Sequence, residues 1–523
     1  MVVSDRDPEV LEQAKDVLRR DGISLVLRLR LASTLHEVLM EMGAPDADEL
    51  GATVAELARS GGDDPLVRRV ALLDQVDVAR LRHGPAELAQ AAQALAADPP
   101  LDDARREAVR WRAVLDGLAR AIDAGVEADD DLVQHAIAAT QALLPADRMT
   151  PASRASLLLE AAHLARVVGA QEQALELARS AMAAAGLAAL PPGEAPVPVA
   201  PDGFALRAWL LLSDVLTPVE GPAAALVAQR SAVEAARRIG APGAVGWARR
   251  GVGHLQQRLE RYDEAVVSYA EAARLLLEAG GTVEAAELMV NQARLELELD
   301  DLPRARATAT SASDLLVGEW VRTDQPGAEE YRRRVLAPLR RDAFELVAIA
   351  AGAQDDHMEA VAWWRRSSDA DIEAGGRGAT YRSSGAEALG RAGDLDGAEA
   401  EYVEALLMAR PAGQRDDDPN SLWQRGLIRH RRAVTRAEAG NTTGAAADAE
   451  VAIESFRSAG VPARAASSGW LLAQILVNGG RAAEAARANA IATQDLDASR
   501  DDDPHLRSRL ADQRTRIAQA LEG

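Results

Sequence analysis

The stretch Glu260-Arg261-Tyr262-Asp263-Glu264-Ala265-Val266-Val267-Ser268-Tyr269-Ala270-Glu271-Ala272 decides the fold. Ala265 opens a helical run, and a second small residue, Ala272, follows seven positions later. Twelve positions before Ala265 stands Gly253. Small residues at these three positions let two antiparallel helices approach closely, so the stretch predicts the second helix of a packed pair.

The same frame recurs along the chain. The alanines that open a helical run are Ala174, Ala225, Ala265, Ala305, Ala360, Ala398, Ala445 and Ala485. Twelve positions earlier stand Ala162, Ser213, Gly253, Ala293, Ala348, Ala386, Ala433 and Ala473. Seven positions later stand Ala181, Ala232, Ala272, Ala312, Ser367, Ala405, Ala452 and Ala492. We call these positions the small-residue ladder, and it predicts an array of helical pairs.

Glycine supports the frame independently, because only 39 of the 523 residues are glycine. Fifteen positions after five of the ladder alanines stand Gly240, Gly280, Gly375, Gly413 and Gly460. Five positions before four of them stand Gly169, Gly393, Gly440 and Gly480, with acidic residues in other repeats. Glycine is favoured just past a helix C-terminus, where φ is usually positive. The two columns therefore predict the ends of the two helices of each pair.

The recurring step between ladder alanines is about 40 residues. Residues 260–272 resemble the second half of a tetratricopeptide repeat, and Asp394 to Ala398 with Tyr402 and Ala405 is a second match. The family's period of about 34 residues and its terminal proline are both absent. The longer helices are similar to those of kinesin light chains and of bacterial regulators with a helical sensor region. This resemblance covers roughly residues 150–498 and implies an all-α, TPR-like α-solenoid, a right-handed superhelix of antiparallel helix pairs.

Composition agrees with an all-α chain that grows by adding repeats rather than separate globular domains. Helix formers dominate, and aromatic residues make up 3% of the sequence. We expect a helical N-terminal cap at 1–62, divergent helical repeats at 63–148, the repeat array at 149–498 and a capping helix at 499–523. Helices are predicted at 8–20, 25–42, 46–59 and 504–521, and loops at 187–203, 317–329 and 410–421. Asp98 and the run that begins at Asp129 are expected to cap helix N-termini.

The net charge of −22 argues against nucleic acid as the main partner, since phosphate binding needs a basic surface. Lys15 is the only lysine among 59 basic residues, which suggests a GC-rich, bacterial genome. The N-terminus lacks the pattern of a signal peptide, and the longest apolar runs are too short to span a bilayer. We therefore expect a cytoplasmic protein that does not insert into membranes.

Motifs of catalysis are missing from the sequence. Cysteine is absent, and Lys15 lies outside any Gly-rich loop, which excludes a P-loop. The histidines have no spacing typical of a zinc site. We expect a non-enzymatic protein with no cofactor and no metal.

In tetratricopeptide arrays the first helix of each pair lines the concave side. The resemblance therefore implies a peptide- or partner-binding groove. The expected binding residues are Trp247, Arg250, His254, Arg258, Arg294, Arg391, His430, Trp470 and Asn478. Other expected lining residues are His163, Arg207, Asp214, Thr380, Ser383 and Glu387. Arg250, His254, Arg258 and Arg294 form a group of donors that suits a carboxylate of the partner.

Three functions fit these observations. The first is a scaffold or adaptor that binds a protein or peptide partner, with an acidic or C-terminal carboxylate segment, in its concave groove. The second is a regulatory sensor that responds to a peptide or small ligand and acts on a partner protein. The third is a structural subunit that assembles with copies of itself as a homo-oligomer.

Overall fold

The structure is a computed structural model that describes residues 8–20, 22–42, 44–127, 129–144, 149–187, 202–322, 328–410, 418–499 and 503–522. Helices account for the regular structure in these ranges, and no strand occurs in them. The all-α prediction is confirmed. The chain divides into two compact units, residues 1–260 (unit 1) and 261–523 (unit 2).

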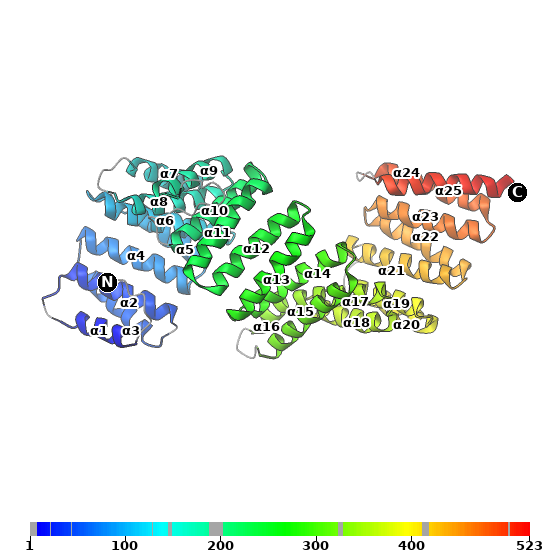
Figure 1. Cartoon of the computed structure of the whole chain (residues 1–523), viewed down its shortest axis with the longest axis horizontal. Coiled ribbons are helices and arrows are strands. Elements are labelled where there is room, and N and C mark those ends of the chain that lie inside the picture. The colour runs from blue at the N-terminus through cyan, green and yellow to red at the C-terminus, as the bar shows by residue number, and fades with distance from the viewer. Residues whose placement is uncertain are drawn as a thin grey trace. The chain divides into compact units, whose positions relative to one another are not determined.

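Unit 1 is a succession of antiparallel helices (Figure 1). Its helices are α1 (Pro8–Leu18), α2 (Leu25–Glu41), α3 (Ala47–Ser60), α4 (Pro65–Arg82), α5 (Pro85–Ala97), α6 (Ala104–Asp123), α7 (Asp130–Leu143), α8 (Pro151–Val167), α9 (Gln171–Ala184), α10 (Asp202–Val219), α11 (Pro222–Ile239) and α12 (Pro242–Arg258). Helices α2, α4, α6, α8 and α10 pack on one another as a layer, and the intervening helices pack on that layer.

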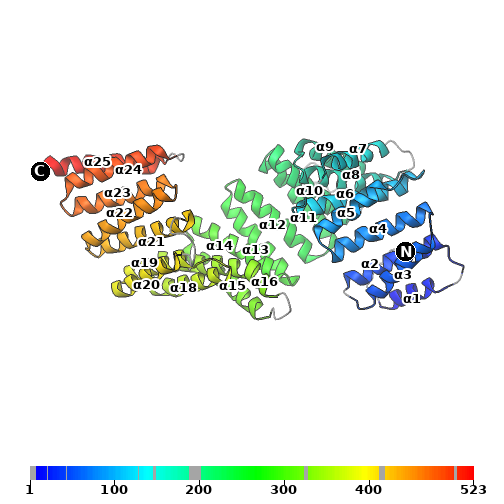
Figure 2. The same ribbon diagram turned by 180° about the vertical axis from the view of Figure 1, so that it is seen from behind.

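Unit 2 repeats the same arrangement (Figure 2). Its helices are α13 (Tyr262–Glu278), α14 (Thr282–Glu298), α15 (Leu302–Arg322), α16 (Ala328–Tyr331), the π-helical turn η1 (Arg332–Leu336), α17 (Ala337–Ala353), α18 (His357–Glu373), α19 (Ala379–Arg391), α20 (Leu395–Met408), α21 (Pro419–Glu438), α22 (Thr442–Ser458), α23 (Pro462–Asn478), α24 (Ala482–Ala498) and α25 (Pro504–Glu522). Each unit is therefore a TPR-like stack of antiparallel helix pairs.

The small-residue ladder is buried throughout. Every ladder position is buried, and most of its alanines have no exposed surface at all. Around the ladder pack larger side chains such as Tyr269 and Tyr402, both fully buried. Small residues at the helix crossings keep the backbones close while the larger neighbours fill the space between layers. The ladder is therefore the packing interface that the sequence predicts.

The predicted glycine turns are also present. Gly169, Gly393, Gly440 and Gly480 have φ between 74° and 88°, and the C-terminal glycines Gly240, Gly280, Gly375 and Gly460 have φ between 75° and 94°. Gly413 lies outside the described residues. Where the frame places acidic residues instead of glycine, Glu260, Asp300 and Asp355 adopt the same left-handed conformation, with φ of 58°, 59° and 61°.

Four local expectations need correction. Residues 317–322, predicted as loop, continue α15, because Leu316 in that helix is buried in the core of unit 2. Residues 202–203, 328–329 and 419–421, also predicted as loop, open α10, α16 and α21. Asp98 does not cap a helix N-terminus. Its carboxylate accepts hydrogen bonds from Arg68 and Arg69 instead, and Asp103 caps α6. Most of the predicted loops at 187–203 and 410–421 lie outside the described residues.

Among the described helices, none combines the length and the apolar character needed to cross a membrane.

Candidate functional site

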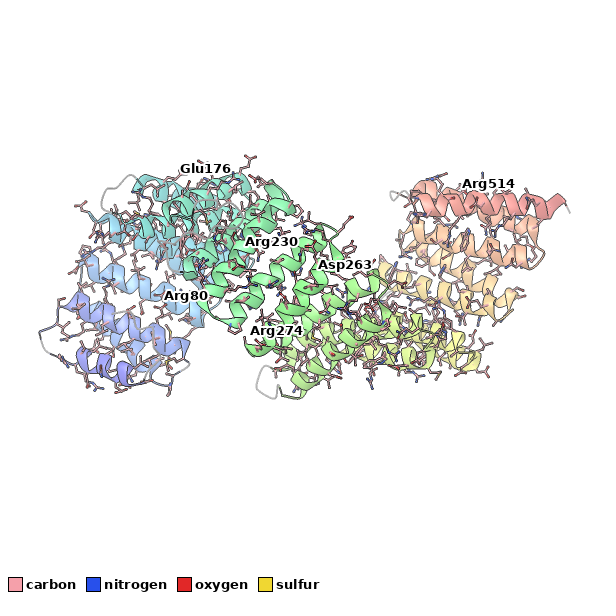
Figure 3. The ribbon with its side chains drawn as sticks, in the orientation of Figure 1. Arg80, Glu176, Arg230, Asp263, Arg274 and Arg514 are labelled. Carbon is pink, nitrogen blue, oxygen red and sulfur yellow. The ribbon has the colours of Figure 1, made fainter. Side chains whose placement is uncertain are left out.

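A cavity of about 390 Å³ opens on the layer formed by α2, α4, α6, α8 and α10 in unit 1. Its volume falls within the range of ligand-binding pockets. Charged side chains dominate its wall: Arg30, Arg80, Arg112, Arg120, Arg207, Glu37, Asp77, Asp116 and Glu160. Figure 3 labels Arg80, near the C-terminal end of α4. We call this space the charged cavity.

Each carboxylate of the charged cavity has a guanidinium partner. Arg80 pairs with Glu37 at 2.5 Å and with Asp77 at 3.3 Å. Arg120 pairs with Asp116 one helical turn away, at 2.8 Å. The Arg80–Glu37 pair therefore holds α2 against α4, whereas the Arg80–Asp77 and Arg120–Asp116 pairs each lie within one helix.

The fourth pair joins α8 to α10. Arg207 Nη2 donates to Glu160 Oε1 at 2.7 Å. Glu160 is only 5% exposed, and its second oxygen, Oε2, is buried without a hydrogen-bond partner among the described residues. A buried acceptor without a donor costs free energy, so this oxygen is an incomplete part of the site.

Two guanidiniums of the cavity remain. Arg30 on α2 and Arg112 on α6 are exposed to the cavity and have no ion-pair partner among the described residues. Arginine donates in a planar fork that matches a carboxylate, so both side chains are available to an anionic group. The wall thus holds five arginines against four carboxylates.

Burial shifts the titration of the acids in this region. Removal from water, together with the nearby Glu37 carboxylate, raises the pKa of Asp77 to about 7. Burial also raises the pKa of Glu160, and the Arg207 guanidinium and, after it, the charge of Arg112 oppose that rise. Desolvation in the same way raises the pKa of Asp214 and lowers that of His163. These groups sit in a drier environment than surface residues do.

A second cavity, of about 300 Å³, adjoins the first and shares Arg30, Val70, Leu73 and Val109 with it. Apolar side chains supply most of its surface, through Val26, Leu66 and Leu101 as well as the shared residues, and charged side chains complete the lining: Arg69, Asp103, Arg105 and Arg106. We call it the apolar chamber. The two cavities are therefore neighbours with part of their lining in common.

A network of buried ion pairs lies next to the apolar chamber. Arg69 donates to Asp98 at 2.5 Å, to Glu107 at 2.8 Å and to the carbonyl oxygen of Pro99 at 2.7 Å. Arg110 donates to Glu107 at 2.8 Å as well. All four charged side chains are buried. Because each is paired, the network holds α4, α5 and α6 together and leaves no group for a ligand.

The residues predicted from the resemblance lie in both units. In α12, Arg250 Nε donates to Nε2 of His254 at 3.3 Å, and its guanidinium lies 5.0 Å from the Trp247 ring centroid. Burial, and then the Arg250 charge, lower the pKa of His254. Arg258 is exposed at the end of the same helix. Arg294, the fourth donor of the predicted group, belongs to unit 2 and pairs there with Asp342 at 2.7 Å.

The remaining predicted residues of unit 2 lie on α19, α21 and α23. Arg391 pairs with Glu387 at 2.6 Å, and Gln474 donates to Asn478 at 3.1 Å. His430 Nδ1 lies 2.9 Å from the Ser468 hydroxyl, and burial lowers the pKa of His430 to about 4. 

Trp470 lies under α25. The Arg509 guanidinium stands 4.8 Å from its ring centroid, and Gln513 donates to its carbonyl oxygen at 3.0 Å. Thr380 and Ser383 accept hydrogen bonds from Arg431 at 2.9 and 2.8 Å. These polar groups therefore serve contacts between neighbouring helices.

Sequence reasoning places Arg207 in the groove, and Arg207 lines the charged cavity. It misses the rest of the cavity, most of which lies on α2, α4 and α6, before the ladder begins. One local signal was available. Charged residues recur three or four positions apart on α2, α4 and α6, for example at Asp116 and Arg120, which places them on one helix face.

No protein-family model matches the sequence, and no curated protein matches it. Solved structures with a similar fold include a signal transduction ATPase with numerous domains and a tetratricopeptide repeat sensor, from Pyrococcus horikoshii. Identity to it is 12%, the TM-score is 0.44, and the match covers 84% of this chain and 63% of that chain. Aspartyl phosphate phosphatase F from Bacillus subtilis matches at 11% identity and a TM-score of 0.38, over 75% of this chain and 96% of that one. A Rap protein complexed with competence and sporulation factor matches at 12% identity and a TM-score of 0.31. The match covers 78% of this chain and 100% of that chain.

Proposed function

We propose that the protein is a cytoplasmic, non-enzymatic adaptor that binds a carboxylate-bearing peptide or segment of a partner protein in the charged cavity of unit 1. One observation carries the proposal. Arg30 and Arg112 line the cavity without an ion-pair partner among the described residues, whereas each carboxylate of the wall has one.

The surrounding charge explains how such a site selects its ligand. The chain has a net charge of −22, so an anionic partner is repelled at long range by most of its surface. Affinity must then come from the local fork-shaped contacts of Arg30 and Arg112 inside a concave wall. A carboxylate segment meets this requirement. A nucleic acid does not meet this requirement, because its binding needs a broad basic surface.

The regulatory sensor is the second candidate, and the layout of the cavity favours it. Five successive layer helices, from α2 to α10, contribute to one wall. A ligand that contacts α2 and α8 at once stabilises one spacing of these helices over others. Binding would then change the surface that unit 1 presents to a partner protein.

The test compares partner affinity for the wild type and for the double variant Arg30→Gln with Arg112→Gln. The partner is recovered by pull-down from the source organism, and its affinity is then measured by calorimetry. Loss of these charged hydrogen-bonded contacts should weaken binding by roughly 1.5 to 3 kcal/mol for each contact. Higher salt should weaken the wild-type complex more than the variant complex.

The matched control is Arg19→Gln with Arg237→Gln, which removes the same charge from exposed positions of unit 1 outside the cavity. This control should bind like the wild type. Equal affinity of all three proteins would place the partner elsewhere and overturn the proposal.

A further inference from the structure

The buried oxygen of Glu160 calls for a hydrogen-bond donor. Glu160 Oε1 is occupied by Arg207 at 2.7 Å, while Oε2 is buried and has no partner among the described residues. The carboxylate is 5% exposed and lines the charged cavity. An acceptor in this position gains most from a charged donor, because charge-assisted hydrogen bonds are the stronger ones. A ligand ammonium group supplies such a donor.

The donor and the carboxylate of the ligand meet groups on two neighbouring helices. Arg112 stands on α6 and Glu160 on α8, and these two helices pack directly on each other. Packed helix axes lie about 8 to 10 Å apart, and an extended chain advances about 3.3 Å per residue. A peptide of about three residues, roughly 10 Å when extended, is therefore long enough to reach from one helix to the next.

The apolar chamber adds a side-chain preference. Val109 lies one turn before Arg112 on α6 and lines both cavities, as Arg30 does. A carboxylate held by Arg112 and Arg30 brings the last residue of the peptide to the mouth of the chamber. Val26, Leu66 and Leu101 then surround an apolar side chain at that position.

Resting on the proposed function, we infer that the ligand of unit 1 is a short peptide of about three residues with both termini free. Its N-terminal ammonium donates to Glu160 Oε2, its C-terminal carboxylate is held by Arg112 and Arg30, and the side chain of its last residue is apolar and enters the apolar chamber.

The test uses a pool of tripeptides in three forms: free, N-acetylated and C-amidated. The full-length protein is incubated with each pool, and retained peptides are measured by affinity-selection mass spectrometry. We expect the wild type to retain free peptides with apolar last residues. Retention should fall at least tenfold after acetylation and at least tenfold after amidation. This comparison needs no variant, so it stands even if a substitution disturbs folding.

Two variants assign the contacts. Glu160→Gln keeps the side-chain size and should make retention insensitive to acetylation, while Arg112→Gln should make it insensitive to amidation. Glu176→Gln is the matched control, since Glu176 is exposed on α9 and does not line the cavity. It should retain the pools as the wild type does.

Several results would overturn the inference. Retention that ignores acetylation in the wild type would show that Glu160 contacts no ligand ammonium. Acetylated peptides retained through an internal lysine would place a side chain, not a terminus, at Glu160. If no tripeptide is retained although partner binding still depends on Arg30 and Arg112, this inference fails and the proposed function stands. If partner binding is also independent of those arginines, both fail.

Discussion

Gly469 on α23 lies so close to Ala492 on α24 that a β-carbon at position 469 would stand 2.8 Å from the β-carbon of Ala492. Ala492 is a ladder position and fully buried. The contact shows what the small-residue ladder does: it sets the distance between paired helices at the limit that small side chains permit.

Gly469→Ala should therefore destabilise the protein, by about 1 to 3 kcal/mol, because the added methyl group overpacks the α23–α24 crossing. The free energy of unfolding from urea titration measures this. Gly352→Ala on α17 is the control, since a β-carbon there meets only Ala360, at 3.8 Å. It should stabilise by about 0.5 to 1 kcal/mol, as alanine does in helices. Equal effects of the two changes would contradict the packing argument.

The ladder alanines predict a second packing effect. Ala452→Leu on α22 and Ala272→Leu on α13 enlarge fully buried positions and should each cost roughly 1 to 3 kcal/mol. Ala447→Leu, at an exposed position of α22, should change stability little. The urea concentrations at the unfolding midpoints of the three variants, compared with that of the wild type, test this prediction. A wild-type midpoint for Ala452→Leu would mean that the interface tolerates extra volume.

The acidic residue in a left-handed turn predicts a stabilising change. Asp300 has φ of 59°, a conformation that costs a residue with a β-carbon about 1 to 2 kcal/mol. Asp300→Gly removes that cost and should stabilise by about 0.5 to 1 kcal/mol after the added chain entropy. Thermal melting measures the gain. Glu298→Gly, inside the last turn of α14, should instead destabilise by about 0.5 to 1 kcal/mol.

Asp77 predicts a pH dependence in unit 1. Burial, and then Glu37, raise the pKa of Asp77 to about 7 from an unfolded value near 4, so the folded state binds the proton more tightly. The stability that this proton confers is complete below about pH 4 and is lost as the pH rises through 7. The variant Asp77→Asn has no carboxyl group at this position and should not lose stability in this way as the pH rises. Its stability relative to the wild type should improve between pH 5 and pH 8, as measured by urea midpoints. Parallel curves would contradict the raised pKa.

His430 predicts the opposite dependence in unit 2. Burial, and then Arg431, lower the pKa of His430 to about 4, so the folded state resists protonation. The stability of the neutral ring is present above about pH 6.5 and is lost as the pH falls to 4, by roughly 2 to 3 kcal/mol. His430→Gln keeps a polar partner for Ser468 and should be less acid-sensitive than the wild type. Urea titrations at pH 4.5 and 7.5 test this, and an unchanged acid sensitivity would assign the effect to other groups.

The repeat pattern could be predicted from the sequence because close packing of paired helices imposes local, periodic demands. An alanine such as Ala265 and its partners Gly253 and Ala272 must all be small wherever two helices cross. A turn such as that at Gly393 needs φ above zero, which few residues accept. Both requirements involve residues only a few helical turns apart along the chain. They therefore appear in the sequence as small residues and glycines at fixed spacings.

The charged cavity was decided by tertiary structure alone. Whether an arginine is paired depends on carboxylates far away in the sequence: Arg80 meets Glu37 across 43 positions and Arg207 meets Glu160 across 47. Arg112 has no ion-pair partner among the described residues, although Asp116 stands four positions from both Arg112 and Arg120 and pairs with Arg120. The sequence states which charges exist. Which of these charged side chains form ion pairs between helices is determined only by the stacking of α2, α4, α6, α8 and α10. Coulomb and hydrogen-bond energies depend on distances that the fold creates.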